Sequence, residues 1–200
     1  MNAFAAPLGL RVDVELPDDE LERELETLWR RLNRPGDILH VLPCLPISHL
    51  GLVFRYREAD GEHYVYVEDP TRQRLAGYTV FNRLVELSRR ADPHMRAPHS
   101  KFASAYQRRG IAKAVYSWWL DSGRCLISGV RQSSGAHALW HSLSGQYALH
   151  YVELRAKALR WFATPAGCVH ADLYTRMLLL GRGQSLRHFS KATGMQLGGG

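Results

Sequence analysis

The chain has 200 residues, 46% of them hydrophobic, and a formal net charge of +7 with a pI of about 9.6. This length and apolar content predict a single domain with one sizeable core. No apolar run is long enough for a membrane-spanning helix, and the N-terminus lacks the basic and apolar segments of a signal peptide.

The cysteines indicate the redox compartment of the protein, and the positive charge indicates the partners that it could bind. Cys44, Cys125 and Cys168 are far apart in the sequence and form no C-x-x-C pair, which favours reduced thiols and a cytoplasmic location. The positive charge would attract nucleic acid, CoA-type phosphates or acidic partners, and ordinary solubility charge explains it equally well. The oligomeric state stays open, a dimer included.

The first part of the chain predicts a strand, a helix and a second strand. Residues 10–16 alternate apolar and polar side chains, as in a half-buried strand. A helix follows from Asp18 or Asp19 to about Asn33, with acidic residues at its start and arginines at its end. Its inner stripe is Leu21, Leu25, Leu28, Trp29 and Leu32. Residues 38–45 predict a short buried strand.

The next part predicts a hairpin and further strands. Two alternating runs, 52–56 and 63–67, flank the turn sequence from Ala59 to Glu62. Further strands are expected at 75–81 and 101–105. Residues 82–90 fit either a strand continuation or a short helix, and 92–98 a loop.

The second half predicts helices between strands. A glycine-containing turn opens a helix, and then come a strand at 125–128, a helix ending near Gly145 and strands at 147–154 and 169–180. Residues 157–163 are apolar without a clear pattern. The order of elements predicts a mixed α/β fold with a mostly antiparallel central sheet flanked by helices. We expect one domain over 1–190 and a flexible tail over 191–200.

The turn from Gln107 to Ala112 is the most informative stretch. A turn of this kind presents backbone N–H groups at a helix N-terminus, where the helix dipole also favours an anion such as a pyrophosphate. Gly110 has no Cβ to obstruct the approach of a phosphate. The following helix is expected to bury Ile111, Ala114, Val115 and Trp118.

The hexapeptide QRRGIA at this turn resembles the Q/R-x-x-G-x-G/A motif of the GCN5-related N-acetyltransferases (GNAT superfamily). The helix, strand and second helix that follow extend the resemblance over roughly residues 100–155. The resemblance implies a GNAT-like acyl-CoA acyltransferase fold. It also implies that two parallel strands, 101–105 and 125–128, splay apart to form a slot for the thioester.

The resemblance further implies that the chain binds acetyl-CoA, with the pantetheine arm beside the strand before the turn. The residues that it assigns to this co-substrate are Phe102, Ala103, Gln107, Arg108, Arg109, Gly110, Ile111, Ala112, Ser133 and Trp140. Ser133 stands where the family often has Asn, and it would equally serve as a helix N-cap.

The candidate catalytic groups differ from the pattern of the family. Trp140 stands where the family carries a general-acid Tyr, and an indole N–H donates a hydrogen bond but does not transfer a proton. Ser142 and Tyr147 are our preferred donors, and the alternatives are His141, Ser144, Tyr106, Ser104 and His99. For the base we select Glu86, and Glu68, Asp69 and His99 remain open.

No metal site is expected. His137 and His141 are spaced i, i+4 on one helix face, but the sequence offers no evident third ligand. Cys168, His170 and Asp172 alternate as strand residues do, which explains them without a metal.

Two functions are therefore weighed. The first is transfer of an acetyl group from acetyl-CoA to an amine on a small molecule, a protein or a nucleic acid. The alternative keeps the fold with a different donor or no transferase activity, as a basic module that binds or modifies nucleic acid. No membrane association is expected in either case.

Overall fold

The computed structural model describes residues 18–130, 132–162 and 174–198. Its helices are α1 (Asp18–Leu32), α2 (Ile111–Asp121), α3 (Ser134–Leu143) and α4 (Leu186–Thr193), with 3-10 turns η1 (Asp92–His94) and η2 (Ser104–Tyr106). Its strands are β1 (Val53–Ala59), β2 (Glu62–Asp69), β3 (Arg74–Asn82), β4 (Met95–Phe102), β5 (Cys125–Ile127), β6 (Leu149–Arg155), β7 (Ala158–Phe162), β8 (Thr175–Leu179) and β9 (Gln196–Leu197).

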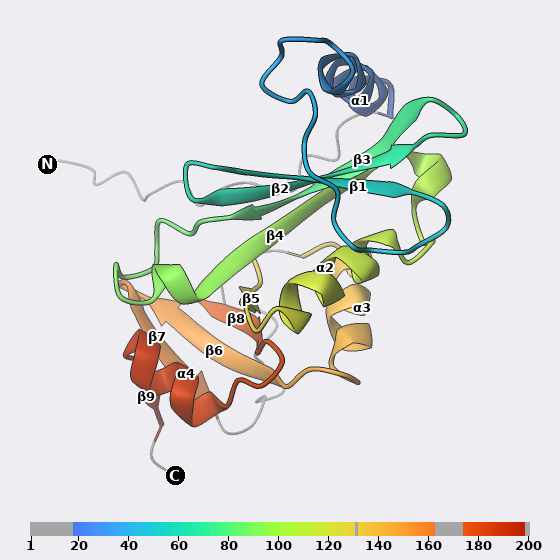
Figure 1. Cartoon of the computed structure of the whole chain (residues 1–200). Helices are drawn as coiled ribbons and strands as arrows, with labels where there is room; N and C mark the ends of the chain where they lie inside the picture. Colours follow the sequence, from blue (N-terminus) through green and yellow to red (C-terminus); the bar gives the residue numbers. More distant parts are fainter. Residues whose placement is uncertain (1–17, 131, 163–173, 199–200) are drawn as a thin grey trace, which may run out of the picture.

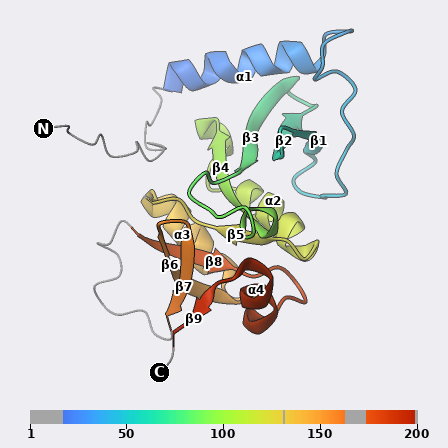
Figure 2. The ribbon, with the colours of Figure 1, turned by 90° about the vertical axis from the view of Figure 1, so that its left-hand side faces the viewer.

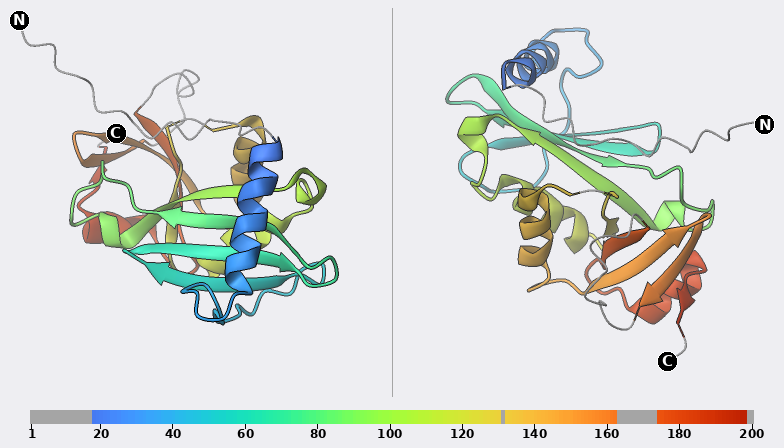
Figure 3. Two further views of the ribbon diagram at one scale, coloured as in Figure 1. Left: turned by 90° about the horizontal axis from the view of Figure 1, so that it is seen from above. Right: turned by 180° about the vertical axis from the view of Figure 1, so that it is seen from behind.

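These strands form one mixed sheet. Within the described residues its order is β1-β2-β3-β4-β5-β8-β6-β7-β9. The pairs β4–β5 and β7–β9 are parallel, and the other pairs are antiparallel. Helix α1 lies on one face of the β1–β4 half, and α2 and α3 lie on the other (Figure 1, Figure 3). The expected fold class, a mostly antiparallel α/β sheet flanked by helices, is confirmed.

Helix α1 matches the amphipathic helix predicted from the sequence. Leu21, Leu25 and Leu32 of its apolar stripe are buried, and the helix lies across the first strands of the sheet (Figure 2). The hydroxyl of Tyr78 on β3 donates to the carboxylate of Glu24 at 2.6 Å. Apolar burial and this hydrogen bond together hold α1 on the sheet.

The predicted hairpin is confirmed as β1 and β2. Asp60 and Gly61 form its turn with φ of 56° and 75°. Positive φ at both central residues is typical of the type I′ turn, which matches the twist of the flanking strands. The strand expected next, at 75–81, is β3, which pairs with β2 along its length.

The buried strand expected at 38–45 is wrong. Ile38 is 65% exposed and Val41 is 79% exposed, and Val41 has a φ of 59°, which interrupts an extended strand. Asp37 pairs with Arg31 at 3.0 Å and anchors the start of this segment to the end of α1. The segment is therefore turns up to Val41, with Leu39 buried in the core, and only an isolated antiparallel bridge between Cys44 and Arg55 pairs it with β1.

The loop expected at 92–98 is also corrected. Strand β4 begins at Met95 and already ends at Phe102, so the strand expected at 101–105 is displaced towards the N-terminus. Pro98 lies inside β4, beyond the last residue that pairs with β5. A proline is tolerated in a strand where one edge has no partner, so Pro98 is compatible with this part of β4.

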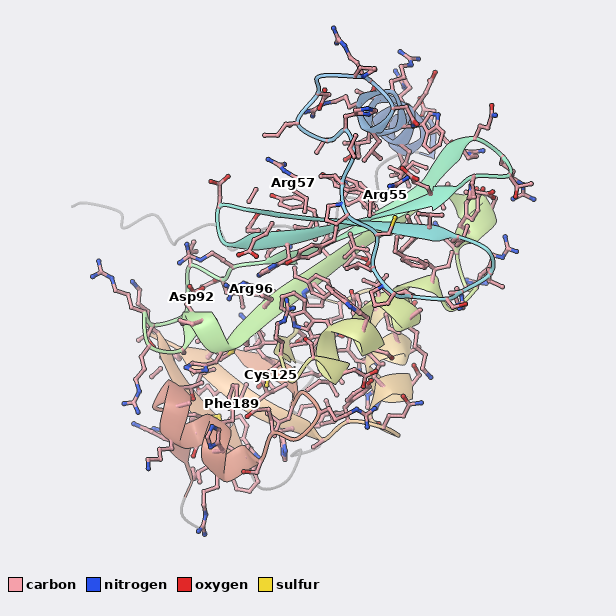
Figure 4. All side chains as sticks on the ribbon, in the orientation of Figure 1. Arg55, Arg57, Asp92, Arg96, Cys125 and Phe189 are labelled. Atoms are coloured by element: carbon pink, nitrogen blue, oxygen red, sulfur yellow. The ribbon has the colours of Figure 1, made fainter. Side chains whose placement is uncertain are left out.

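A second core lies between the β5–β9 half of the sheet and α4. Cys125 and Phe189 are buried in it (Figure 4), and so is Met195. The flexible tail expected at 191–200 is therefore corrected over its described part, because α4 continues to Thr193 and β9 pairs with β7. Both elements are short, and neither shows a long apolar pattern in the sequence.

The remaining expectations have mixed outcomes. Strand β6 confirms the strand at 147–154, and the unassigned stretch at 157–163 contains β7. Residues 83–91 are a loop, neither of the two alternatives considered. The strand at 10–16 and residues 169–173 lie outside the described residues. No helix in the described part of the chain is long and apolar enough to cross a membrane.

Candidate functional site

Strands β4 and β5 part from each other at their carboxyl ends. They pair in parallel only through Met95 with Cys125 and Arg96 with Leu126, whereas residues 97–102 of β4 continue to pair with β3 on the other side. The backbone edge of β4 that faces β5 therefore has no strand partner beyond this point (Figure 1). At the end of β4, the Phe102 carbonyl accepts from Gln107 Nε2 at 3.0 Å. The carboxyl ends of parallel strands joined by a helix are where α/β sheets bind ligands.

The turn between β4 and α2 lies at this open end and is exposed. Arg108 and Gly110 have φ of 56° and 76°, and residues 107–110 are all exposed. The N–H of Ala114 donates to the Gly110 carbonyl at 3.0 Å as the first α-helical hydrogen bond. The N–H groups of residues 111–113 consequently have no partner within the helix and are directed out of its positive end.

Helix α2 is fixed by its buried face. Ile111 and Val115 are buried as expected, but Ala114 and Trp118 are only half-buried. The sheet-facing positions include Tyr116, Trp119 and Leu120 instead. The helix is therefore rotated slightly from the predicted orientation, and its start remains anchored beside the turn by Ile111.

A second helix begins after β5. The hydroxyl of Ser133 accepts a hydrogen bond from the N–H of Ala136 at 3.2 Å, so Ser133 is the N-cap of α3. Trp140 on the same helix is buried with Leu143 in the larger hydrophobic core, which α1, β2, β3 and α2 also form. Two helix N-termini thus follow the two diverging strands.

The three predicted catalytic residues do not meet. Ser142 is exposed on α3, and its hydroxyl donates to the Leu139 carbonyl at 2.8 Å. The Tyr147 hydroxyl donates to Asp121 at the far end of α2, about 15 Å from the turn along the helix. Glu86 lies in the β3–β4 connection, at the opposite end of β4, about 25 Å from the turn. Tyr147 and Glu86 therefore lie away from the turn, whereas the Ser142 carbonyl lies 3.4 Å from Lys113 Nζ near the start of α2.

Tyr147 takes part in a cluster at the end of α2. Its hydroxyl lies 2.9 Å from Asp121 Oδ1, and the Nε atom of Arg182 lies 2.8 Å from the same oxygen. Burial raises the pKa of Tyr147. Burial opposes ionisation of Asp121, but the hydrogen bonds from Arg182 and Tyr147 hold its pKa below the ordinary value. This cluster joins three segments of the fold.

Two of the alternative base candidates are occupied. Glu68 is buried and accepts from Arg55 Nε at 3.2 Å. Asp69 is buried and accepts from the Tyr106 hydroxyl at 2.7 Å, a hydrogen bond that lowers its pKa. His99 lies half-buried on the part of β4 beyond the β5 pairing.

Sequence reasoning missed a buried tyrosine beside β4. Ser100, on the part of β4 beyond the β5 pairing, donates to the Tyr116 hydroxyl at 3.3 Å and lies 2.8 Å from the hydroxyl of Thr79. Burial raises the pKa of Tyr116 to about 12, so it keeps its proton at neutral pH. The only signal in the sequence is a tyrosine on the inner face of an amphipathic helix, which ordinarily indicates a core residue.

The two histidines of α3 lie side by side. The Nε2 atoms of His137 and His141 lie 3.2 Å apart. The described residues contain no group of three His, Cys, Asp or Glu side chains that could hold a metal ion. The alternating residues Cys168, His170 and Asp172 lie outside the described residues.

No family model and no curated protein matches this chain. Among solved structures it is similar to the ribosomal L7/L12 alpha-N-protein acetyltransferase RimL in complex with coenzyme A, with 12% sequence identity and a TM-score of 0.35. The match covers 60% of this chain and 60% of the length of that one.

Proposed function

We propose that this protein is an N-acetyltransferase that moves an acetyl group from acetyl-CoA to an amine. The observation that carries the proposal is the separation of β4 from β5 after two residue pairs, with an exposed helix start directly after β4. Such an arrangement, a strand edge without a partner beside an anion-binding turn, suits a long, thin thioester with a diphosphate at its other end.

The turn would hold the diphosphate through backbone groups. The N–H groups of residues 111–113 lack helical partners, and Arg108 and Arg109 add positive charge on the exposed turn. The pantetheine arm would lie along β4 near Phe102, where the edge towards β5 has no strand partner. Its amides would then take hydrogen bonds that a neighbouring strand would otherwise make.

Acyl transfer also needs a donor for the departing thiolate and a neutral amine to attack the thioester. Tyr116 is our candidate donor, because it contacts β4 beyond the β5 pairing and is protonated at neutral pH. Replacement by Phe would remove the hydroxyl while keeping the ring packed against Phe81. Under this assignment Tyr116→Phe lowers kcat more than it changes the affinity for acetyl-CoA.

A thermal-shift measurement tests whether the protein binds acetyl-CoA, the proposed acetyl donor. Ligand at about 100 times its Kd adds about 2.7 kcal/mol of stability, which for a chain of this size raises the unfolding midpoint by about 5 to 10 °C. Gly110→Glu, which places a carboxylate in the turn, should abolish that shift. If neither acetyl-CoA nor CoA raises the midpoint of the unmodified protein, the proposal is wrong.

Gly183→Glu is the matched control. Gly183 has a φ of 78°, close to the 76° of Gly110, and is also exposed. Both substitutions therefore introduce the same charge and the same backbone strain, but Gly183 lies in the connection before α4. The control variant should keep the full shift.

The acceptor is then identified by measuring the release of free CoA thiol with three classes of candidate: small amines, peptides with free amino groups and nucleic-acid amines.

A further inference from the structure

A cleft of about 210 Å³ lies beside the turn that precedes α2. Three separate segments form it: residues 50–52 before β1, the β2–β3 turn with Asp69, Thr71 and Arg72, and the stretch after β4 with Tyr106 and Arg109. Arg109 belongs to the predicted diphosphate-binding turn. The cleft therefore adjoins that turn directly.

Two arginines line the cleft, and few negative groups offset their charge. Arg72 and Arg109 approach the ring of Tyr106 to 5.7 and 5.9 Å from its centroid. The carboxylate that Arg72 meets is Asp69, at 3.9 Å. Arg109 donates to the Ala105 carbonyl at 3.5 Å and makes no ion pair with any described residue. Two positive groups thus border one cleft.

The carboxylate in the cleft already accepts hydrogen bonds from the protein itself. Asp69 accepts from the Tyr106 hydroxyl at 2.7 Å and from the Arg72 backbone N–H at 3.0 Å. These bonds fix the Tyr106 ring and the β2–β3 turn in place. The single negative charge of Asp69 offsets one of the two guanidinium charges, so the cleft keeps a net positive charge and favours an anion.

Size and charge indicate which anion. The volume is below the range of about 300 to 1,000 Å³ that holds a whole small molecule, so the cleft suits one end of a larger ligand. Guanidinium groups match the oxygens of a phosphate in shape and charge. The two guanidinium groups can both donate to the oxygens of one phosphate monoester, although Asp69 offsets one of their charges.

We propose that this cleft binds the 3′-phosphate of the acyl-CoA donor, an inference that rests on the proposed function. Coenzyme A carries its diphosphate on the 5′ carbon and a phosphate monoester on the 3′ carbon of one ribose. A diphosphate on the turn consequently brings the monoester close to Arg109. Arg72 then contacts a group that dephospho-CoA lacks, and the cleft selects CoA over dephospho-CoA.

Titration calorimetry with CoA and dephospho-CoA tests the inference. We expect the unmodified protein to bind dephospho-CoA about tenfold more weakly, since charge-assisted hydrogen bonds at an exposed site are lost. Arg72→Ala should bring the ratio of the two Kd values close to one. Arg89→Ala is the matched control, because Arg89 is an exposed arginine at the opposite end of β4, and it should keep the tenfold ratio.

The outcomes separate the two proposals. Equal affinity of the unmodified protein for both ligands overturns the 3′-phosphate site and leaves the acetyltransferase proposal standing. If neither ligand binds, both proposals are wrong. A third arm measures retention of a single-stranded RNA oligonucleotide. If Arg72→Ala reduces that retention but leaves the CoA to dephospho-CoA ratio unchanged, the cleft binds nucleic-acid phosphate and the inference is overturned.

Discussion

The imidazole Nε2 of His49 lies 2.8 Å from the carbonyl oxygen of Arg109, sixty residues further along the chain. His49 precedes β1, in the long connection from α1, whereas Arg109 is the residue before the N-cap of α2. The ring also lies 3.5 Å from the position that a Cβ on Gly110 would occupy. His49 therefore supports the turn from outside the helix and strand that flank it.

Loss of this support should weaken ligand binding more than folding. We expect His49→Ala to lower the affinity for acetyl-CoA about fivefold, which corresponds to the net value of one hydrogen bond of about 1 kcal/mol. His49→Gln offers an amide N–H at a similar reach and should restore most of the affinity. Calorimetric titration measures both. Equal affinity of His49→Ala and the unmodified protein would show that the contact does not hold the turn.

The close approach of β3 and β4 at Gly77 gives a stability prediction. A Cβ on Gly77 would lie 2.3 Å from Phe102 Cδ1 and 2.4 Å from the Lys101 carbonyl oxygen. Gly77→Ala should therefore destabilise the fold by about 3 kcal/mol, because the strands must separate. Gly135→Ala is the comparison. It lies in α3, where the atom nearest to an added Cβ is Ser133 Oγ at 4.0 Å, an ordinary contact, and should stabilise by about 0.5 kcal/mol. Urea unfolding measures both.

Tyr147 should behave as a structural residue. Tyr147→Phe removes the hydrogen bond to Asp121 and should lower the free energy of unfolding by about 1 kcal/mol. Because this bond lies at the end of α2 away from the turn, we expect kcat to stay within about twofold of the unmodified value. Steady-state kinetics and thermal unfolding test the two parts separately. A large fall in kcat without loss of stability would return Tyr147 to the catalytic residues.

Asp69 should give stability that depends on pH. The Tyr106 hydrogen bond, with further backbone hydrogen bonds, lowers the folded-state pKa of Asp69 below its ordinary 3.8. A lowered pKa means that the contribution is fully present above the unfolded pKa and is lost as pH falls through the folded pKa. Between about pH 5 and pH 2 the unmodified protein should lose more stability than Asp69→Asn. Urea unfolding at each pH measures the stability of both proteins. An equal loss of stability in both as the pH falls would contradict this assignment.

The cysteines should differ in reactivity. Cys44 is exposed, whereas Cys125 is buried and burial raises its pKa to about 11. At neutral pH we expect iodoacetamide to label Cys44 and to leave Cys125 unmodified until the protein unfolds. Mass spectrometry of the digested protein measures both peptides. Rapid labelling of Cys125 under native conditions would show that the β5–α4 core opens readily.

The elements that could be predicted from the sequence are those whose signals are local. Helix α1 follows from a 3.6-residue apolar period, and the β1–β2 hairpin from alternating side chains around Asp60 and Gly61. Strand β4 was displaced because Pro98 is compatible with a strand only where one edge is unpaired, and pairing is not a local property. Strand β9 was missed because two residues carry no period.

The features of the candidate site were likewise predictable only where their signals are local. The sequence by itself determined that a glycine turn begins a helix after a strand, because φ preference and helix signals belong to a few neighbouring residues. Only the tertiary structure decided that β4 and β5 part after Arg96 and that His49 supports the turn. It alone brought Arg72 beside Arg109 and moved Tyr147 and Glu86 away from the turn. These relations depend on contacts between residues far apart in the chain, and no local pattern encodes them.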